Sequence, residues 1–358
     1  MAPAKNKRNK ENAGLPKRWR FKNGAYFYRV PPGLESAWDG KKEFRLGSSL
    51  SQAHSCYAKR IGVYEGELQL MEELFNRVLI EHVPTLAPKT QSSYRECIKR
   101  LTAAFKGNRI HAIDTPHCYQ YQDAAVKAHG PFVAKHDLQV LSMSFSKAIR
   151  WGARKDHPII GTGYEKPSTP DRDRYIEDWE MVEMLALRPR RKKGSVLMVQ
   201  AYIRVKLLTG LRRTDMLNLN VFTQLRDDGI HVKPSKTKKS SGKKIIIDWT
   251  PELLAAVEMA KAARPVDIGP WLFCNRWGEN YIKENGSVNG FDSIWQRYVE
   301  RVLKETKVTQ DFQERDLRAK CASDLESLER AKALLAHADS RITQKVYRRK
   351  PERVRPLR

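Results

Sequence analysis

The sequence is short of acidic residues relative to basic ones. Its 358 residues contain 41 Asp and Glu against 67 Lys and Arg, which gives a formal net charge of +26 at pH 7. Such an excess is larger than solubility requires, and it repels itself unless a polyanion shares the surface. We therefore expect nucleic acid as the main partner, with an anionic membrane surface as the less favoured alternative.

The sequence also lacks clustered cysteines and long apolar runs. Its five cysteines have no C-x-x-C pair, which argues against a disulfide framework or a zinc site: Cys56, Cys97, Cys118, Cys274 and Cys321. We expect reduced thiols packed as small hydrophobic side chains, without a metal centre or a cofactor. No run approaches the roughly 20 apolar residues of a membrane span, and no signal peptide is visible, so we expect a cytoplasmic protein without a membrane partner.

Hydrophobic residues make up 41% of the chain, which is ordinary for a globular protein, and the length predicts two or three domains. The first 20 residues are typical of a flexible basic arm. Strands are predicted at 25–30 and 42–46, followed by a helix over 51–70, so we expect a small α/β module in residues 1–65. Its aromatic side chains alternate with Arg and Lys, which fits contacts along a DNA groove and a miniature core equally well.

Residues 66–160 show helical spacing of apolar side chains and no strand pattern, which predicts a helical bundle. Residues 161–175 are rich in Gly, Pro, Ser and charge and are typical of a linker. Residues 176–358 are mostly helical with one hairpin, whose strands 229–233 and 244–249 are joined by PSKTKKSSGK. We therefore expect a mainly α fold with small β elements, an α+β class, in three domains.

Three short segments of the last domain contain residues suited to phosphate chemistry. In LLTGLRRTDML a Gly break between helices precedes Arg212, which can hold two phosphate oxygens, and a surface pair of Arg212 with Asp215 explains the pattern equally well. The lysines of the hairpin loop either follow a DNA backbone or include one proton donor. The last segment contains Arg318, His337 and Tyr347, and the positive charge around Tyr347 favours a phenolate nucleophile.

Together these segments resemble the catalytic domain of the tyrosine recombinases. The order T-G-x-R-x-x-D, S-K-T in a basic hairpin, D-L-R, L-L-x-H and then Tyr ten residues later covers most of residues 175–350. The front half is similar to the lambda-type phage integrases, because LPKRWRFKNGAYFYRV and KKEFRLG resemble their arm-binding domain and the segment ending FSKAIRWG resembles their core-binding domain. The resemblance implies a three-stranded sheet in the N-terminal module and a small sheet in the catalytic domain.

The resemblance implies a site-specific DNA recombinase, a phage or prophage integrase that cuts and rejoins DNA through a 3′-phosphotyrosyl intermediate without metal or ATP. Tyr347 would attack the scissile phosphate, while Arg212 and Arg318 would bind its oxygens. Lys236 would protonate the leaving 5′ oxygen, with Lys238 as the reserve candidate. His337 would donate a hydrogen bond to the phosphate. Asp215 and Arg315 would be supporting residues.

The implied partners are double-stranded attachment sites of core and arm type, a homotetramer on DNA and accessory DNA-bending proteins. The implied location is the cytoplasm of a bacterial host, in association with the nucleoid. We expect DNA contacts from the N-terminal module, the hairpin and the segment after the nucleophile: Lys17, Arg18, Arg20, Tyr26, Tyr28, Lys238, Lys239, Lys243, Arg348 and Arg349.

Two departures from the family's pattern keep alternatives open. Arg315 stands three residues before the second arginine, where the family usually has His, and an arginine cannot act as a general base. The segment between Arg318 and His337 is shorter than usual, and Ala336 stands where Gly is usual. The alternatives are a catalytically impaired DNA-binding protein on the same scaffold and a type IB topoisomerase, against which the arm-binding module argues.

Overall fold

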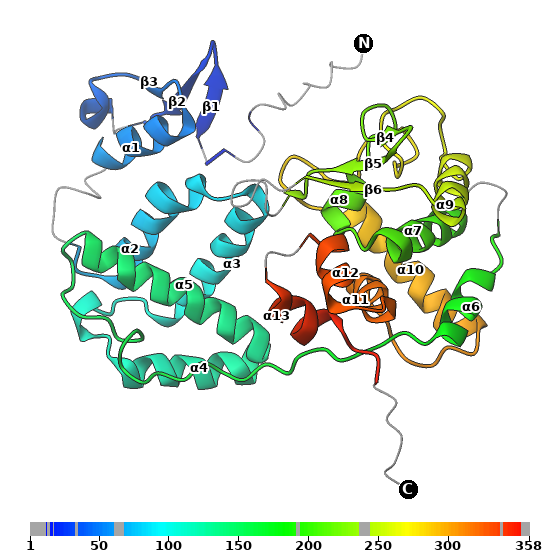
Figure 1. Ribbon diagram of the computed structural model, residues 1–358. Coiled ribbons are helices and arrows are strands. Elements are labelled where there is room, and N and C mark those ends of the chain that lie inside the picture. Colours follow the sequence, from blue (N-terminus) through cyan, green and yellow to red (C-terminus); the bar gives the residue numbers. More distant parts are fainter. Residues whose placement is uncertain are drawn as a thin grey trace, which may run out of the picture. The chain divides into compact units, whose positions relative to one another are not determined.

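The computed structural model describes residues 12, 15–16, 18–32, 35–60, 68–190, 194–235, 244–336 and 339–351. Contacts divide the chain into two compact units, residues 1–169 and 170–358. The fold is mainly helical with two three-stranded antiparallel sheets, which confirms the predicted α+β class (Figure 1). None of the helices in these described ranges is long and apolar enough to cross a membrane.

Three antiparallel strands open the first unit: β1 (Trp19–Lys22), β2 (Ala25–Arg29) and β3 (Glu43–Gly47). The turn between β1 and β2 is Asn23–Gly24, where φ is 48° and 71°. Two successive positive φ angles match the right-handed twist of a hairpin, so the chain reverses and Trp19 pairs with Tyr28. The sequence had assigned Trp19 and Arg20 to the flexible arm, and the structure corrects this, because both belong to a strand.

An aromatic core lies between this sheet and helix α1 (Leu50–Arg60). Tyr28 is 6% exposed, and its ring centroid lies 4.7 Å from that of Trp38, which belongs to the short helix η2 (Glu35–Trp38). Of the two interpretations of the aromatic residues, the miniature core is therefore right for Tyr28. The helix predicted over 51–70 was too long, because residues 68–70 are not helical.

A helical bundle with its own apolar cluster completes the first unit. Its elements are α2 (Met71–Arg77), η3 (Val78–His82), η4 (Val83–Thr85), α3 (Pro88–Ala104), η5 (Ile110–Ala112), α4 (Thr115–His129) and α5 (Pro131–Arg150). Proline stands in the first turn of α3, α4 and α5, where its missing N–H costs no hydrogen bond. The helical spacing of apolar side chains predicted for this region is confirmed on α5, where four residues form one fully buried stripe: Leu138, Leu141, Phe145 and Ala148.

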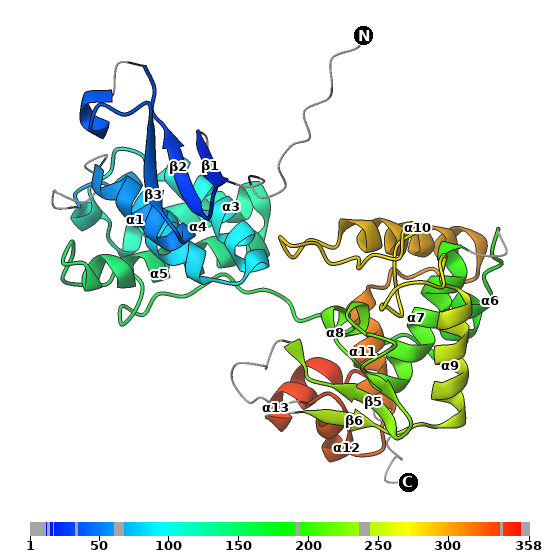
Figure 2. The ribbon, with the colours of Figure 1, turned by 90° about the horizontal axis from the view of Figure 1, so that it is seen from above.

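The second unit contains nine helical elements and one sheet in its described part. The helical elements are α6 (Asp178–Ala186), α7 (Ser195–Thr209), α8 (Arg213–Leu217), α9 (Pro251–Ala262), α10 (Asn289–Glu305), α11 (Glu314–Asp324), α12 (Leu328–Leu334) and α13 (Ser340–Ile342), followed by the π-helical turn η7 (Thr343–Tyr347). Helix α7 is buried on nearly all sides and packs against α9, α10 and α11 (Figures 1 and 2). A helix that is apolar all round belongs in the middle of a unit, and α7 ends at the site described below.

The sheet of the second unit has the order β4 (Leu225–Arg226), β5 (Gly229–Val232) and β6 (Ile245–Ile247). The predicted hairpin is confirmed, because Ile230 pairs with Ile247 and Val232 pairs with Ile245 in an antiparallel register. The two-residue strand β4 was not predicted. Residues 236–243, between β5 and β6, lie outside the described residues.

Candidate active site

The end of helix α7 is shaped around Gly210. This residue has a φ of 59°, and a Cβ there would lie 2.7 Å from Leu335 Cδ2 and 3.1 Å from Cys321 Sγ. Glycine avoids both the left-handed strain and this crowding. The chain can therefore turn sharply at the end of α7 and present Arg212 as the residue that precedes α8.

Arg318 lies in the second turn of α11 and connects the end of α7 to the residue after α12 by hydrogen bonds. Its guanidinium donates hydrogen bonds to the carbonyl oxygens of Gly210 and Leu335, the latter at 2.9 Å, and the residue is 5% exposed. Burial lowers the pKa of Arg318, and repulsion from Arg212 lowers it further. The half-buried Arg212 is therefore close enough for the two guanidinium groups to act on each other.

Tyr347 is the last residue of η7, and its ring lies beside Arg318. The distance from the Arg318 guanidinium carbon to the Tyr347 ring centroid is 5.2 Å, and a side-chain hydrogen bond between them counteracts the lowering of the Arg318 pKa. Ser323 Oγ donates a 2.9 Å hydrogen bond to the Tyr347 carbonyl and accepts one of 2.7 Å from the Arg349 amide. The backbone on both sides of Arg348 is thereby tied to α11.

These contacts bring three of the predicted catalytic residues together. Arg212, Arg318 and Tyr347 come from the start of α8, from α11 and from η7, and 135 residues separate the first from the last (347 − 212). Two guanidinium groups next to a phenol form a site for an oxyanion with a nucleophile beside it. This is the arrangement that attack on a phosphodiester requires.

Asp215, predicted as a supporting residue, is 6% exposed in α8. Its Oδ1 accepts a 2.9 Å hydrogen bond from the Ser235 amide. Ser235 is followed directly by Lys236 in the chain, so Asp215 ties the segment of the first arginine to the start of the lysine-rich loop. The alternative reading of the motif, a surface pair of Arg212 with Asp215, does not describe the structure, because Asp215 is buried and bonded to Ser235.

Six predicted residues lie outside the described part of the chain: Lys17, Lys236, Lys238, Lys239, Lys243 and His337. The residue before His337, Ala336, has a φ of 50°, which is the left-handed region that favours glycine. The expectation that Gly is usual at this position thus has a conformational basis. Leu335, whose carbonyl binds Arg318, is only two residues before His337.

The N-terminal residues predicted to bind DNA fall into two groups. Arg18 and Arg20 are exposed, and Arg20 forms an ion pair with Glu43 of β3. Tyr26 is half-buried against the aromatic core, and Tyr28 is part of that core. The prediction of a DNA contact by Tyr28 is therefore corrected to a packing role, because its side chain fills the space between sheet and helix.

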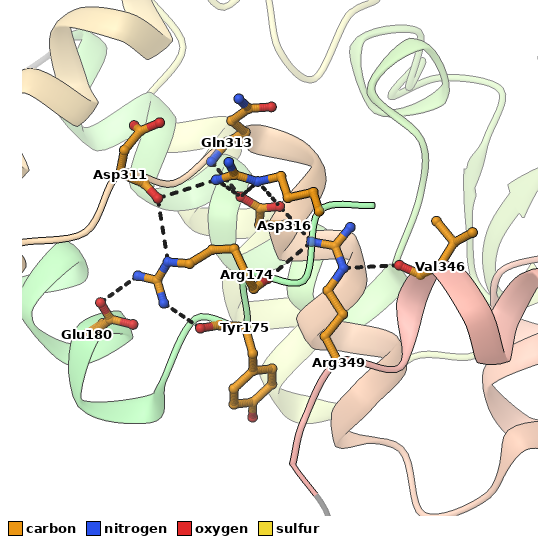
Figure 3. A network of polar contacts seen from close by, with 9 residues as sticks. Arg174, Tyr175, Glu180, Asp311, Gln313, Asp316, Val346 and Arg349 are labelled. Carbon is orange, nitrogen blue, oxygen red and sulfur yellow. Dashed lines mark hydrogen bonds and ion pairs between the residues drawn. The ribbon is translucent and has the colours of Figure 1, made fainter. Parts of the chain in front are cut away.

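The residues after Tyr347 also differ from each other. Arg348 is exposed, as a DNA contact requires. The Arg349 side chain is 7% exposed and donates a 2.8 Å hydrogen bond to Asp316 Oδ1 (Figure 3). The structure thus gives Arg349 an internal partner in place of the predicted DNA phosphate. Arg315 is exposed on the first turn of α11, three residues before Arg318.

A buried ion pair between α7 and α11 was not predicted from the sequence. Lys206 of α7 and Glu314 of α11 are 1% and 4% exposed and pair with each other, and Lys206 also donates a 2.8 Å hydrogen bond to the Leu211 carbonyl. Burial raises the pKa of Glu314, but Lys206, Tyr202 and Arg213 lower it more, so the carboxylate remains charged. A lysine inside the apolar run VLMVQAYIRVKLLTG was the available signal, because a charge in a buried helix needs a partner.

The cysteines and carboxylates form no metal site in the described residues. No group of three or more His, Cys, Asp or Glu side chains is arranged to hold a metal ion within these ranges. Four of the five cysteines are buried, and Cys56 is half-buried. Burial raises the pKa of Cys321, next to Gly210, to about 12, so this thiol is inert packing.

No protein-family model matches the chain, and no curated protein matches it. Among solved structures, it is similar to a lambda integrase tetramer bound to a Holliday junction, with a TM-score of 0.63 and 16% identity over 96% of this chain and 98% of the other. The chain has the lambda integrase fold. A lambda integrase dimer bound to a COC′ core site gives a TM-score of 0.62 and 17% identity over 96% and 98% of the two chains.

The chain is also similar in structure to the integrase of a transposon. The Tn1549 transposon integrase, residues 82–397 in complex with circular intermediate DNA, gives a TM-score of 0.60 and 13% identity over 78% of this chain and 95% of that one. The resemblance to tyrosine recombinases that the motifs suggested is thus confirmed at the level of the fold. The lambda integrase matches span both units of this chain, including the N-terminal sheet module.

Proposed function

We propose that this protein is a tyrosine recombinase, a DNA integrase that cuts and rejoins DNA at specific sites. The observation that carries the proposal is the convergence of Arg212, Arg318 and Tyr347 at the end of α7, with the Arg318 guanidinium 5.2 Å from the Tyr347 ring. The integrase fold supports it independently, because that likeness rests on the backbone. The lambda integrase and the Tn1549 transposon integrase share this fold, so the proposal covers the integrase of a phage or prophage and that of a transposon.

In the proposed reaction the Tyr347 phenolate oxygen attacks the scissile phosphorus. The new bond is a 3′-phosphotyrosyl ester, and the bond that breaks joins phosphorus to the 5′ oxygen of the next nucleotide. Arg212 and Arg318 neutralise the non-bridging oxygens as charge builds up in the transition state. Lys236 or Lys238 donates the proton that the 5′ oxygen needs, and His337 hydrogen-bonds the phosphate.

Asp215 has a supporting role in this proposal. Through Ser235 it holds the start of the loop that contains Lys236. The covalent link conserves the energy of the phosphodiester, so a free 5′ hydroxyl can reverse the step without ATP. The phenol proton leaves to water or to a group other than Arg315, because a guanidinium does not accept protons at neutral pH.

The proposed partner is double-stranded DNA with core-type and arm-type sites, and the proposed assembly on DNA is a tetramer, with accessory DNA-bending proteins. Two neighbours are integrase complexes with a core site and with a Holliday junction, the latter a tetramer. The net charge of +26 fits a large DNA surface. We expect the logarithm of affinity to fall with the logarithm of salt concentration by about 0.9 for each phosphate contacted.

A second candidate function is a DNA-binding protein on this scaffold that no longer cuts. The observation that favours it is Arg315, which is exposed on α11 where the recombinases usually have a histidine. Such a protein would keep its salt-dependent affinity for specific DNA and form no covalent adduct. The type IB topoisomerase remains the third alternative, and the N-terminal sheet module gives it no support.

The test uses nicked duplexes made from the DNA that flanks the gene, which trap the cleaved intermediate. Wild-type protein should form an adduct that survives denaturing detergent, and Tyr347→Phe should bind the same duplexes without forming it. Binding by the wild type without any adduct would establish the non-cutting alternative. Relaxation of plasmids that lack the flanking sequence, at the rate of plasmids that carry it, would establish a topoisomerase.

A further inference from the structure

The carboxylate of Asp316 lies at the centre of a buried arginine cluster in the second unit (Figure 3). Asp316 is fully buried in the first turn of α11, two residues before Arg318. Arg172 donates hydrogen bonds to both carboxylate oxygens at 2.7 to 2.9 Å. Arg349 donates to Oδ1 at 2.8 Å, and the backbone N–H of Gln313 donates to Oδ2 at 2.8 Å. One carboxylate therefore binds two guanidinium groups, one from near the first residue of the second unit and one from near its last residue.

The first of these groups belongs to the segment by which the chain enters the second unit. Arg172 is the third residue after the boundary at 169/170. Arg174 continues the attachment, because it donates to the Asp311 carbonyl at 3.4 Å and to Glu180 Oε1 at 2.5 Å (Figure 3). The entering segment is thereby fixed to the residues just before α11 as well as to Asp316.

The second group belongs to the segment that bears the candidate nucleophile. Arg349 is two residues after Tyr347, and its guanidinium also donates to the Val346 carbonyl at 3.0 Å and to the Arg174 carbonyl at 3.1 Å. The entering segment and the nucleophile segment therefore touch each other directly and share Asp316. Figure 3 shows the Arg349 side chain lying between Val346 and the Asp316 carboxylate.

The cluster is held together by a charged carboxylate. Burial raises the pKa of Asp316, but the hydrogen bonds from Arg172, the Gln313 amide and Arg349 lower it more, so the net shift is downward and the carboxylate stays charged. If Arg172 is removed, the buried carboxylate keeps Arg349 as its cationic partner but loses the three hydrogen-bond contacts that Arg172 makes to its oxygens, which is costly. The Asp316 carboxylate and the Asp311 carbonyl, which accept hydrogen bonds from Arg172, therefore resist its displacement.

We infer that Asp316 is a positioning residue that couples the segment entering the catalytic unit, through Arg172 and Arg349, to the placement of Tyr347 beside Arg318. The inference rests on the proposed function, since it concerns the geometry of that cleavage site. Asp316 and Arg318 stand within one turn of α11, so the same carboxylate that holds the nucleophile segment is fixed relative to the phosphate-binding arginine. A displacement of about 1 Å at a reacting group can reduce a rate by about 100-fold.

The functional consequence is a connection between the linker and the chemistry. The entering segment is the covalent link between the two units, so a change in its path reaches Tyr347 through Arg172, Asp316 and Arg349. A cluster that only stabilised the start of α11 would be affected by the same substitutions, but it would not change the exposure of the nucleophile segment. The two roles are therefore separable by experiment.

The main test variant is Arg172→Gln, because Arg172 is 26% exposed at its side chain and the change is less disruptive than one at Asp316 itself. The matched control is Arg190→Gln, an equal charge change at a side chain that is 74% exposed and paired with Glu305. Single-turnover adduct formation on nicked duplex should fall by about 10-fold or more in Arg172→Gln. The dissociation constant for the duplex should change less than threefold, and the control should match the wild type in both.

Hydrogen exchange gives a readout that does not depend on cleavage. The peptide covering residues 343–351 should exchange faster in Arg172→Gln than in wild type, although its sequence is unchanged, and the control should leave it as it is. The pair Arg172→Gln and Arg349→Gln should be non-additive in both exchange and adduct rate, because both act through Asp316. Arg349→Lys, which keeps the charge, should restore part of the rate lost in Arg349→Gln.

The outcomes separate this inference from the proposed function. If the wild type forms no adduct, the proposed function fails, while faster exchange of 343–351 in Arg172→Gln still supports the coupling. If the wild type cleaves and Arg172→Gln has wild-type cleavage and wild-type exchange, the coupling is overturned and the proposed function stands. Additive effects of the two substitutions, with unchanged exchange, would equally overturn it.

Discussion

Two buried arginines, one in each unit, bind backbone carbonyl groups in a similar way and differ in the charges around them. In the first unit Arg154 is 6% exposed and donates to the carbonyl oxygens of Ile110, at 2.9 Å, and Ile113. Its NH2 group also pairs with Asp156 Oδ2 at 2.7 Å. The positive charge of Arg154 is thus balanced by a carboxylate, and the residue serves the fold.

In the second unit Arg318 binds the carbonyl oxygens of Gly210 and Leu335 and is equally buried. The charged side chain that most affects its pKa is another arginine, Arg212, and the phenol of Tyr347 lies beside it. Two guanidinium groups held together against their repulsion form an environment that an anion would stabilise. The neighbouring charges, more than burial or the number of hydrogen bonds, therefore distinguish Arg154 from Arg318, the arginine that fits the proposed chemistry.

The largest expected effect on stability is that of Arg154→Met. The substitution leaves the Ile110 and Ile113 carbonyl groups without their donor in a buried site, so we expect the first unit to lose about 3 to 5 kcal/mol of unfolding free energy. Urea denaturation followed by hydrogen exchange in residues 71–150 measures it. Arg150→Met, at an exposed position on α5, should stay within about 0.5 kcal/mol. A loss below about 1 kcal/mol in Arg154→Met would contradict the structural role of Arg154.

Arg318→Lys should destabilise the fold less than Arg154→Met, because a lysine can still donate to a carbonyl group, but its effect on cleavage should be large. A lysine keeps the charge, but it cannot donate to two carbonyl groups and still reach the phosphate beside Tyr347. Loss of one such donor reduces a rate by about 100-fold to 1000-fold, which corresponds to about 2.7 to 4 kcal/mol of transition-state stabilisation. Adduct formation on nicked duplex measures the rate, with Arg190→Lys as the control. A variant that cleaves within threefold of the wild type would assign Arg318 to the fold alone.

Gly210→Ala tests the carbonyl partner of Arg318. Left-handed strain costs an alanine about 1 to 2 kcal/mol, and its Cβ would lie 2.7 Å from Leu335 Cδ2. Gly152 in the first unit is the matched control, because its φ is 76° and a Cβ there would have no neighbour within 4 Å. We expect thermal unfolding to report strain alone for Gly152→Ala and strain plus crowding, together with slower cleavage, for Gly210→Ala. Equal losses at the two glycines would contradict the crowding argument.

The sequence was sufficient for those parts of the site whose residues follow a local pattern. The Gly break before Arg212 and the order of Arg318 and Tyr347 are visible as short motifs, and the stripe on α5 follows from helical spacing. The hairpin was found because its strands flank a long run of lysine and serine.

The remaining errors concern side chains whose partners are far away in the chain. Arg349 resembles a DNA contact because it stands in a basic run, and nothing local reveals that Asp316 lies 33 residues before it and binds it. Arg172 is 144 residues from the same carboxylate. The aromatic residues of the N-terminal sheet illustrate the same limit, because alternation predicts that Tyr28 faces one side of a strand but not whether that side is covered by a helix.

The two units should also respond differently to acid. In the first unit His157 Nδ1 accepts hydrogen bonds from the amides of Ile159 and Ile160, at 3.0 and 2.9 Å, and Nε2 donates to the Ser142 carbonyl. Burial lowers the pKa of His157, and a proton on Nδ1 would break both amide contacts. A histidine with a lowered folded-state pKa contributes stability that is complete above its usual value of 6.5 and is lost as pH falls below it.

In the second unit the corresponding group is Asp316, whose pKa is lowered from its usual 3.8, so its contribution persists until the pH falls below that value. Between pH 7.5 and 5 we therefore expect the first unit to lose stability and the Asp316 cluster to keep it. Urea denaturation at both pH values, followed unit by unit by pulse proteolysis, measures the difference. His157→Asn should remove part of the pH dependence, and the exposed His111→Asn should not. A first unit equally stable at both pH values would contradict the expectation.

The smallest expected effect, and the only favourable one, is that of Ala336→Gly beside the second carbonyl partner of Arg318. Ala336 has a φ of 50°, which costs alanine about 1 to 2 kcal/mol, whereas glycine raises the entropy of the unfolded chain by only about 0.4 to 1 kcal/mol. We expect a net gain of about 0.5 to 1 kcal/mol in unfolding free energy, measured by urea denaturation. Ala333→Gly, the same substitution at an exposed position within α12, should instead lose about 1 kcal/mol. Opposite signs at two alanines three residues apart would establish that backbone conformation decides the effect, whereas a loss at both would contradict the left-handed conformation at Ala336.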